Sequence, residues 1–469
     1  MQSSRSPALV VPDAITEGDI NKGSRRAAWT AALGPTARQA VARDGAVFLR
    51  QSLSTPCLSA VRKAEGIWIE DMDGRRIMDF HGNSVHHIGY GHPRLKAALA
   101  RQMDELPFAP RRFTCDPAME LAEKLSALAP WPGGAKVLFA PGGSEAVEMA
   151  LKLARIATGR FKTVSFWDAF HGAGLGASSL GGEQLFRGHG PLLTGTEHVA
   201  PFACYRCPYG FPGRGVPDLS RCAMACATIT EYTLDKQGDV AALVAEPMRA
   251  VPTIAPAGFW PRMRNACDRQ GSLMIFDEIT TGLGKTGSFF AHAHEDTLPD
   301  MLVLGKALGG GMLPLAALLV RPDLDVADAI AIGHYTHEKN PLLARAGLTT
   351  LQIIEEEGLV DNAARLGAYA MERLMEMRQR HPIIGDVRGR GLLIGVELTR
   401  TDGSPALDAA EEMLYRCLTA GLSFKLTMGS VLTLSPPLTL TRVDLDQALS
   451  ILEECLAGLD CYHTNPPKG

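Results

Sequence analysis

Residues 271–287 read GSLMIFDEITTGLGKTG, and residues 301–311 read MLVLGKALGGG. Residues 272–276 and 301–304 are short and almost wholly apolar, as is typical of strands that are buried on both faces of a parallel sheet. The first run ends at Asp277 and Glu278, and the second is followed by Gly305 and Lys306. In open α/β sheets, ligands bind at the carboxyl ends of the strands. We therefore expect an acid and a lysine at that edge of one sheet.

Two interpretations explain an acid and a lysine in so apolar a setting. One is a buried ion pair, since charged groups are rarely buried alone. The other is a site for pyridoxal 5'-phosphate, in which the amine of Lys306 condenses with the cofactor's aldehyde and Asp277 pairs with its ring nitrogen. These residues alone leave both interpretations open.

Strand and helix patterns alternate through the middle of the chain, which predicts an α/β domain with a mostly parallel sheet. Beyond about residue 335, long helices over 341–356 and 360–379 precede short strands and indicate a smaller α+β domain. We expect three regions, namely 1–85 (an N-terminal arm and part of the small domain), 86–335 (the large cofactor-binding domain) and 336–469 (the C-terminal small domain). The first 30 or so residues are expected to form a loose arm. The strands are predicted over 136–140, 163–167, 240–245, 272–276, 301–304 and 316–320.

A glycine turn follows the predicted strand over 136–140. It reads Pro141-Gly142-Gly143-Ser144 and leads into a helical pattern, with Ser144 placed to cap the helix. A helix N-terminus binds anions readily, but many helices begin in this way, so a phosphate site and ordinary capping are both open. Upstream, residues 66–80 predict two strands around an Asp-Gly turn. Residues 81–93 are too rich in Gly and His for regular structure, and a helix should begin near Pro93.

The composition limits the possible classes of function. The chain has 469 residues, of which 46% are hydrophobic and 21% charged, as expected for a globular protein of two or three domains. A net charge of −4 gives no reason to expect nucleic acid or anionic membrane as a partner. No apolar run is long enough to span a membrane and the N-terminus lacks an apolar signal core, so we expect a cytoplasmic protein.

Ten cysteines in a chain of this kind are expected to be mostly reduced. Cys204 and Cys207 are followed by Cys222 and Cys226, a spacing that is compatible with zinc. Cysteines at such spacing also occur without a metal, and we expect no metal here.

Together, these segments resemble one family across nearly the whole chain: the class III pyridoxal phosphate enzymes of fold type I, best known as ω-aminotransferases. The resemblance implies a large domain with a seven-stranded-type sheet, a small domain from both chain ends, and a homodimer. It implies that Gly143 and Ser144 hold the cofactor phosphate, and that Thr336 reaches the phosphate from the partner subunit. The other cofactor-binding residues that it implies are Phe170, His171, Glu246, Asp277, Ile279 and Lys306.

The departures from the family pattern bear on the reaction. Aminotransferases commonly carry an arginine in the last strand that pairs with the carboxylate of an oxo acid, and Thr433 stands there in this chain. A neutral threonine cannot replace a bidentate arginine. Arg249 stands where a glutamine is usual, and Thr280 replaces another glutamine. Residues 83–89 resemble the Asn-rich, His-containing segment of class III lyases, which need no oxo acid.

These features favour a lyase that eliminates a β-hydroxyl from a small primary amine and releases ammonia, with an aminophosphonate as the expected substrate. Lys306 and Asp277 are the candidate catalytic residues. The alternatives are an ω-aminotransferase and a catalytically idle binding protein of this fold. The presence of both Lys306 and Asp277 argues against the last, because a buried amine is costly to keep. The candidate substrate-binding residues are Arg249, His86, Asn83 and Lys425, with Arg390 as a further candidate.

Overall fold

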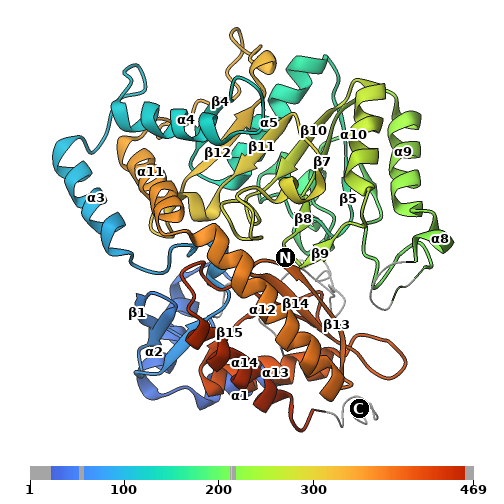
Figure 1. Ribbon diagram of the computed structural model, residues 1–469. Coiled ribbons are helices and arrows are strands. Elements are labelled where there is room, and N and C mark those ends of the chain that lie inside the picture. Colours follow the sequence, from blue (N-terminus) through green and yellow to red (C-terminus); the bar gives the residue numbers. More distant parts are fainter. Residues whose placement is uncertain (1–22, 52–56, 212, 214–217, 460–469) are drawn as a thin grey trace, which may run out of the picture.

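The computed structural model describes residues 23–51, 57–211, 213 and 218–459. Figure 1 shows two domains, a large one coloured cyan to yellow and a smaller one that combines the blue N-terminal and red C-terminal segments. The small domain therefore comes from both chain ends, as expected. Among the described residues, no helix has both the length and the apolar character that a membrane span requires.

The large domain is built on a seven-stranded sheet with the order β4-β12-β11-β10-β7-β5-β6. Strands β11, β10, β7, β5 and β6 are parallel neighbours, whereas β12 runs antiparallel to β11 and β4. The prediction of a mostly parallel sheet is confirmed. The strands are β4 (Lys136–Ala140), β5 (Lys162–Phe166), β6 (Thr196–Val199), β7 (Val240–Ala245), β10 (Leu273–Asp277), β11 (Met301–Leu304) and β12 (Ala316–Val320).

Both faces of the central strands are buried, which explains why their sequences are continuously apolar. Along β10, Met274 and Phe276 pack into one hydrophobic core, while Leu273 and Ile275 pack into a second core on the opposite face. Strand β6 was not predicted, because it lies at the sheet edge and its sequence, TEHV, is only partly buried.

Helices cover both faces of this sheet. Helix α5 packs against β11 and β12, and α10 packs against β10 and α9. Helix α11 packs against α3 and α4 and so belongs to the large domain, although it lies within the range expected for the small domain. The helices are α3 (Pro93–Glu105), α4 (Asp116–Leu128), α5 (Gly143–Thr158), α6 (Leu175–Leu180), α7 (Gln184–Arg187), α8 (Leu219–Cys222), α9 (Ala225–Gln237), α10 (Phe259–Gln270) and α11 (Pro341–Glu356).

The small domain contains two four-stranded sheets. Helix α12 packs on β13 and β14, α13 packs on β15 and β16, and α14 packs on α12 and α13. One sheet consists of β1 (Val61–Glu65), β2 (Trp68–Asp71), β3 (Arg76–Asp79) and β15 (Leu422–Ser423). The other consists of β13 (Ile384–Arg390), β14 (Leu393–Leu398), β17 (Val431–Leu434) and β16 (Lys425–Thr427). The helices are α1 (Ser24–Ala32), α2 (Pro35–Val47), α12 (Leu359–Arg380), α13 (Leu407–Ala420) and α14 (Arg442–Leu456).

The expectation of a loose N-terminal arm is wrong for its last part. Residues 1–22 lie outside the described residues, but helix α1 begins at Ser24. Its polar sequence is held by tertiary contacts, since Arg25 pairs with Glu411 and Glu412 of α13 and Trp29 packs against Tyr415. The predicted hairpin around Asp73-Gly74 is confirmed as β2–β3, and α3 begins at Pro93 as predicted.

Candidate active site

The carboxyl ends of β10 and β11 lie side by side, with Asp277 in register with Val303. Asp277 and the lysine that follows β11, Lys306, are thereby brought to the same edge of the sheet. Asp277 is buried, and its Oδ2 lies 2.8 Å from Nδ1 of the buried His171. Its Oδ1 accepts a hydrogen bond of 3.1 Å from the backbone N–H of Ile279. The carboxylate is thus held at both oxygens.

Lys306 has an unusual backbone conformation. Its φ is +44°, in the left-handed region that side chains other than glycine rarely adopt. Such strain is concentrated at functional sites, where the surrounding structure enforces it. The Nζ atom of Lys306 donates a hydrogen bond of 2.5 Å to Oγ1 of Thr280, a residue that follows Asp277 by three positions. The amine is therefore directed toward the end of the acid-bearing strand.

The glycine turn after β4 forms an uncapped helix end. Helix α5 begins at Gly143, and its N-cap residue, Gly142, makes no side-chain capping bond. The expectation that Ser144 caps this helix is wrong, because Ser144 is its second residue and its Oγ accepts a hydrogen bond of 2.9 Å from the N–H of Ala173. First-turn N–H groups without an intrahelical partner remain to bind an anion.

Close packing around this helix end favours glycine. A Cβ atom on Gly143 would lie 2.6 Å from Cδ1 of Ile279, and a Cβ on Gly172 would lie 2.5 Å from Oγ of Ser144. Gly172 also has a φ of +130°. The helix end, Ile279 and the segment after β5 therefore approach one another more closely than larger residues would permit.

This donor set fits the cofactor that the sequence predicts. The α5 N-terminus suits a phosphate, the Asp277 carboxylate suits a protonated ring nitrogen, and the Lys306 amine suits an aldehyde. Phe170 stands next to His171, and its ring centroid is 4.5 Å from that of Phe186, in a tilted arrangement. The candidate groups for this cofactor thus come from the ends of β4, β5, β10 and β11.

Glu246 and Arg249 lie together beyond β7. The side chain of Glu246 accepts a hydrogen bond from the N–H of Ala250, and its Oε2 is 4.0 Å from Nε of Arg249. Arg249 also donates to the backbone carbonyl of Asp168. Arg249 belongs to strand β8 (Met248–Arg249), which pairs with β9 (Thr253–Ile254) to form a hairpin. Its side chain is buried and borders a cavity of about 650 Å³ between this hairpin and β13–β14.

The Gly- and His-rich segment after β3 is held by Asp79. The Asp79 carboxylate accepts hydrogen bonds from the N–H groups of His81 and Gly82 and from the hydroxyl of Tyr90. Gly82, Asn83 and Ser84 all have positive φ angles, between 46° and 57°. This is a second strained stretch beside the site.

The predicted substrate residues of this segment differ in exposure. His86 is buried beneath Gly82, and its Nε2 lies 3.0 Å from the carbonyl oxygen of Asp79. Asn83 is exposed. Their roles in substrate binding stay predictions. His92 precedes α3 as its N-cap residue, and its Nε2 lies 3.3 Å from Glu357.

Two ionisable groups near the sheet edge, Glu278 and Lys285, are buried, and their burial was not predicted from the sequence. Burial raises the pKa of Glu278 to about 7, although its oxygens accept hydrogen bonds from the N–H groups of Ala291 and His292. Burial also lowers the pKa of Lys285 to about 7. The Nζ atom of Lys285 donates a hydrogen bond of 2.6 Å to the carbonyl oxygen of Pro436. The glycine turn that contains Lys285 gave no sequence signal of this burial.

The other predicted residues lie in the small domain or on the surface. Thr433 of β17 is buried, and its Oγ1 lies 2.7 Å from that of Thr427 in β16. Lys425 is the direct partner of Thr433 in the strand register. Arg390 forms an ion pair of 2.7 Å with Glu295. Thr336 is exposed in the single chain.

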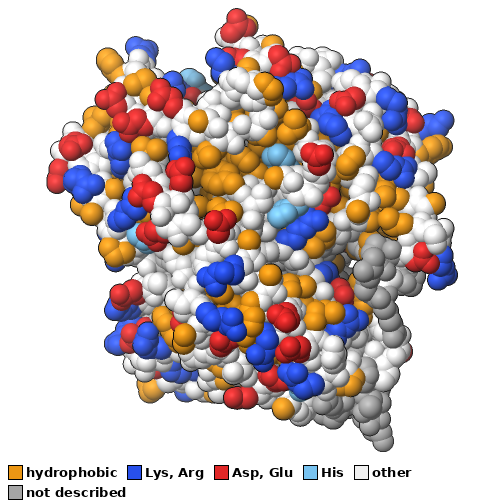
Figure 2. All heavy atoms as spheres, in the orientation of Figure 1, with side chains coloured by type: hydrophobic (Ala, Val, Ile, Leu, Met, Phe, Trp, Pro, Cys, Tyr) orange, Lys and Arg blue, Asp and Glu red, His pale blue; other side chains and the backbone are white. Residues whose placement is uncertain are grey.

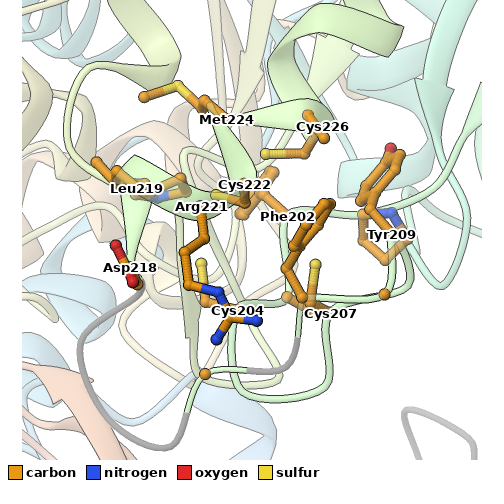
Figure 3. Close-up of a pocket in the computed structure, with 17 residues that line it drawn as sticks. Phe202, Cys204, Cys207, Tyr209, Asp218, Leu219, Arg221, Cys222, Met224 and Cys226 are labelled. Carbon is orange, nitrogen blue, oxygen red and sulfur yellow. The ribbon is translucent and has the colours of Figure 1, made fainter.

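The four closely spaced cysteines line a separate cavity of about 360 Å³. Figure 3 shows the sulfur atoms of Cys204 and Cys207 directed from their loop toward the segments that carry Cys222 and Cys226. Burial raises the pKa of the Cys204 thiol to about 11 and that of Cys226 to about 12. Across the described ranges, no three His, Cys, Asp or Glu side chains are grouped so that they could hold a metal ion.

Comparison with known proteins agrees with this geometry. Residues 50–456 match the family described as aminotransferase class-III. The chain is 43% identical to the (R)-1-hydroxy-2-aminoethylphosphonate ammonia-lyase of Vibrio splendidus, over 97% of this chain and 98% of that protein. It is 33% identical to the alanine/serine racemase of Pyrococcus horikoshii, over 90% of this chain and 91% of that protein. An amine transaminase from an uncultivated Pseudomonas species has been solved with pyridoxal phosphate bound. Its structure superposes on this chain with a TM-score of 0.77 at 33% sequence identity, and the match covers 85% of this chain and 94% of the transaminase chain.

Proposed function

The chain belongs to the class III aminotransferase family, and from this premise we propose that it is an ammonia-lyase that acts on a small β-hydroxy amine carrying a phosphonate. The favoured substrate is (R)-1-hydroxy-2-aminoethylphosphonate, which is converted to phosphonoacetaldehyde and ammonia. The protein is an enzyme, and pyridoxal phosphate is its cofactor. The substrate and the choice of lyase over aminotransferase are our proposal.

The residues described above would hold the cofactor. We assign the phosphate to the first turn of α5 at Gly143 and Ser144, the ring nitrogen to Asp277, and the aldehyde to Nζ of Lys306. Phe170 and Ile279 are assigned to the two ring faces. Glu246 and Thr336 complete the proposed set, with Thr336 acting in the site of a partner subunit. Bound pyridoxal phosphate supplies an electron sink for the carbon that bears the substrate amine.

Lys306 is the proposed base. Its Nζ atom removes a proton from the amine-bearing carbon of the substrate, because the Lys306 side chain is held at the strand edge by its hydrogen bond to Thr280. The carbon–oxygen bond on the neighbouring carbon then breaks, and the hydroxide leaves as water after it takes up a proton. Water adds to the resulting dehydrated amine and yields the aldehyde and ammonia. One water is lost in the elimination and one is added in the hydrolysis, and no oxo acid takes part.

The observation that carries this proposal is the pair formed by Thr433 and Thr427. An aminotransferase must bind an oxo acid in its second half-reaction, and family resemblance implies an arginine at position 433 for its carboxylate. Here the two buried hydroxyls lie 2.7 Å apart in place of that arginine, so no guanidinium group is present at position 433 to pair with a carboxylate. Identity of 43% to an ammonia-lyase over nearly the whole chain supports the same function.

An ω-aminotransferase remains the second candidate, supported by the likeness to the solved amine transaminase. The test is one reaction with purified holoenzyme, 1-hydroxy-2-aminoethylphosphonate and no pyruvate or oxoglutarate. A lyase should release ammonia over many turnovers and keep its cofactor in the aldehyde form. One equivalent of product, conversion of the cofactor to its amine form, and rescue by pyruvate would overturn the proposal in favour of the aminotransferase.

We further propose a homodimer. Thr336, which the resemblance assigns to the site of the partner subunit, is exposed in the single chain, as expected for a residue that acts across a subunit interface. Figure 2 shows hydrophobic side chains gathered in the middle of the large domain, and Phe113 is 67% exposed. Apolar patches of this kind mark interaction surfaces. Light scattering after size-exclusion chromatography should give twice the mass of the chain, and a monomer would contradict the proposal.

A further inference from the structure

The sheet β13-β14-β17-β16 presents one face to its own hydrophobic core and the other to the large domain. Residues that pair directly in antiparallel strands project from the same face. Leu432 pairs with Val396 and Leu426, and all three lie in the core. Thr433 and Lys425 are each one residue from Leu432 and Leu426 along their strands, so their side chains project from the opposite face. Gly395, which pairs with Thr433, lies on that face as well. A Cβ atom on Gly395 would lie 3.2 Å from Cβ of Pro252, so this face is turned toward the β8–β9 hairpin.

Lys425 is thus placed beside the site that an arginine would occupy in an aminotransferase. It is directly opposite Thr433, and Thr427, two residues further along β16, hydrogen-bonds to Thr433 on the same face. The charges of Lys425 and Lys306 both act on one imidazole, that of His81. Burial lowers the pKa of His81 to about 4, and the charges of Lys425 and Lys306 act in the same direction, against that of Asp79. Both amines therefore lie within electrostatic reach of one imidazole.

The arginines nearby are already engaged with acids. Arg249 lies 4.0 Å from the carboxylate of Glu246 and donates to the carbonyl of Asp168. Arg390 pairs with Glu295 at 2.7 Å. Arg388 pairs with Asp386 and Glu397 at 2.8 and 2.7 Å. An anion at any of these guanidinium groups would also meet a carboxylate.

The chemistry of the face suits a tetrahedral anion better than a planar one. A guanidinium group matches the two coplanar oxygens of a carboxylate, whereas an ammonium group is a compact charge with three donors. In the Thr427–Thr433 pair, one hydroxyl proton serves the bond between the two residues, and the other hydroxyl proton is available for a further acceptor. One ammonium and one hydroxyl donor can thus bind different oxygens of the same phosphonate.

We infer that Lys425, together with the hydroxyl pair of Thr427 and Thr433, forms the subsite for the phosphonate group of the substrate. This inference rests on the proposed function and specifies its substrate class. Lys425 binds the dianion by charge, and the hydroxyl pair selects the tetrahedral shape. Arg249, by contrast, is a positioning residue that ties the β8–β9 hairpin to the segment after β5.

The test measures binding and not turnover. Holoenzyme is titrated by calorimetry with ethylphosphonate and with propanoate, which carry the two kinds of anion and lack the amine that would react. The wild type should bind ethylphosphonate more tightly than propanoate. Lys425→Met should weaken ethylphosphonate binding about 10- to 100-fold, as expected for a lost charged hydrogen bond. Lys425→Arg should retain binding of both anions but lose much of the preference for phosphonate.

Matched variants separate the subsite from general effects. Lys63→Met, at an exposed lysine of β1, should bind both anions as the wild type does. Thr433→Val should weaken ethylphosphonate binding about 3- to 10-fold, because only a neutral hydrogen bond is lost. Cofactor content and melting temperature verify that each variant is folded. If Lys425→Met misfolds, Lys425→Arg and Thr433→Val still report on the preference.

The outcomes of the two experiments are distinguishable. Ethylphosphonate binding by folded Lys425→Met that equals the wild type would overturn the subsite, even if the wild type released ammonia in the reaction described above. Loss of phosphonate binding in Lys425→Met together with no ammonia release by the wild type would support the subsite and overturn the lyase. A wild type that prefers propanoate would overturn the phosphonate assignment.

Discussion

Nδ1 of His171 lies 2.8 Å from Oδ2 of Asp277, and both side chains are buried. Because an ionised carboxylate only accepts hydrogen bonds, the proton of this contact belongs to Nδ1 of the imidazole. The second oxygen of Asp277 is held by the N–H of Ile279. The orientation of the acid is thus set by one side chain from the β5 side of the sheet and by its own strand end.

Asp277→Asn should lower turnover far more than it lowers cofactor content. The amide retains the shape of the side chain but cannot stabilise a protonated ring nitrogen by charge. We expect a loss of about 100-fold or more in kcat, in the range seen for removal of one preorganised electrostatic group. Measuring kcat and the cofactor stoichiometry on the same preparation checks this.

His171→Gln serves as the graded control for Asp277→Asn. It leaves the carboxylate in place and removes only the group that orients it, so the expected loss is smaller, about 10-fold, as for an outer partner of a functional group. Wild-type turnover in Asp277→Asn would mean that the acid is structural only.

Lys306→Ala should abolish covalent attachment of the cofactor and leave the fold intact. Lys306 is the lysine at the end of β11, and its amine is directed to Thr280 beside Asp277. Borohydride reduction of the wild type, followed by peptide mapping, should place the cofactor on the peptide that contains Lys306. The variant should lose its cofactor on gel filtration and melt at a lower temperature, since bound ligand stabilises the folded state. Covalent label retained in the variant would assign the anchor to another lysine.

Gly82→Ala should lower the free energy of unfolding by more than the cost of placing an alanine in a left-handed backbone conformation. Gly82 has a φ of +46°, and a Cβ atom there would lie 2.3 Å from the His86 ring. The matched control is Gly133→Ala, with a φ of +85° and no atom within 4 Å of the added Cβ. The control should cost about 1–2 kcal/mol from the left-handed conformation, and Gly82→Ala more than that. Equal changes in the urea unfolding midpoint would show that the His86 contact is unimportant.

The sequence predicted the large sheet well because its strands are buried on both faces. Residues 136–140, 240–245, 301–304 and 316–320 were predicted with the bounds that the structure shows. A continuous apolar run flanked by glycine or charge leaves few other interpretations. Edge strand β6 was not predicted because it is short and three of its four residues are polar, and α1 was not predicted because contacts with α13 hold it.

The site was predicted less completely, because its geometry depends on contacts between distant segments. Local capping rules placed Ser144 at a helix start, but its hydroxyl is used by Ala173, 29 residues away. The resemblance implied that His171 binds the cofactor, but only the fold shows that its imidazole contacts the carboxylate of Asp277. No local pattern indicates that Lys425 stands opposite Thr433, since this follows from the register of β16 and β17.

Lys285 predicts an unusual pH dependence of stability. Its side chain is fully buried, Nζ donates to the carbonyl of Pro436, and burial lowers its pKa from 10.5 to about 7. Between pH 7 and 10.5 the unfolded chain therefore binds a proton that the folded chain does not. The free energy of unfolding rises with pH wherever the unfolded state binds more protons, so this group stabilises the fold as the pH increases through that window.

The measurement is urea unfolding at pH 7.5 and 9.5 for the wild type and Lys285→Met. Over these two pH units the wild type should gain about 2 kcal/mol relative to the variant, at about 1.4 kcal/mol per unit of pH once the folded-state amine is neutral. Glu278, whose pKa is raised to about 7, acts in the opposite sense but mainly below this range. The neighbouring His87 has a pKa well below its usual value, so it stays neutral throughout. Lys63→Met, which removes an exposed lysine, should follow the wild type at both pH values. Parallel pH profiles for the wild type and Lys285→Met would show that Lys285 remains charged in the folded protein, with a second group compensating its charge.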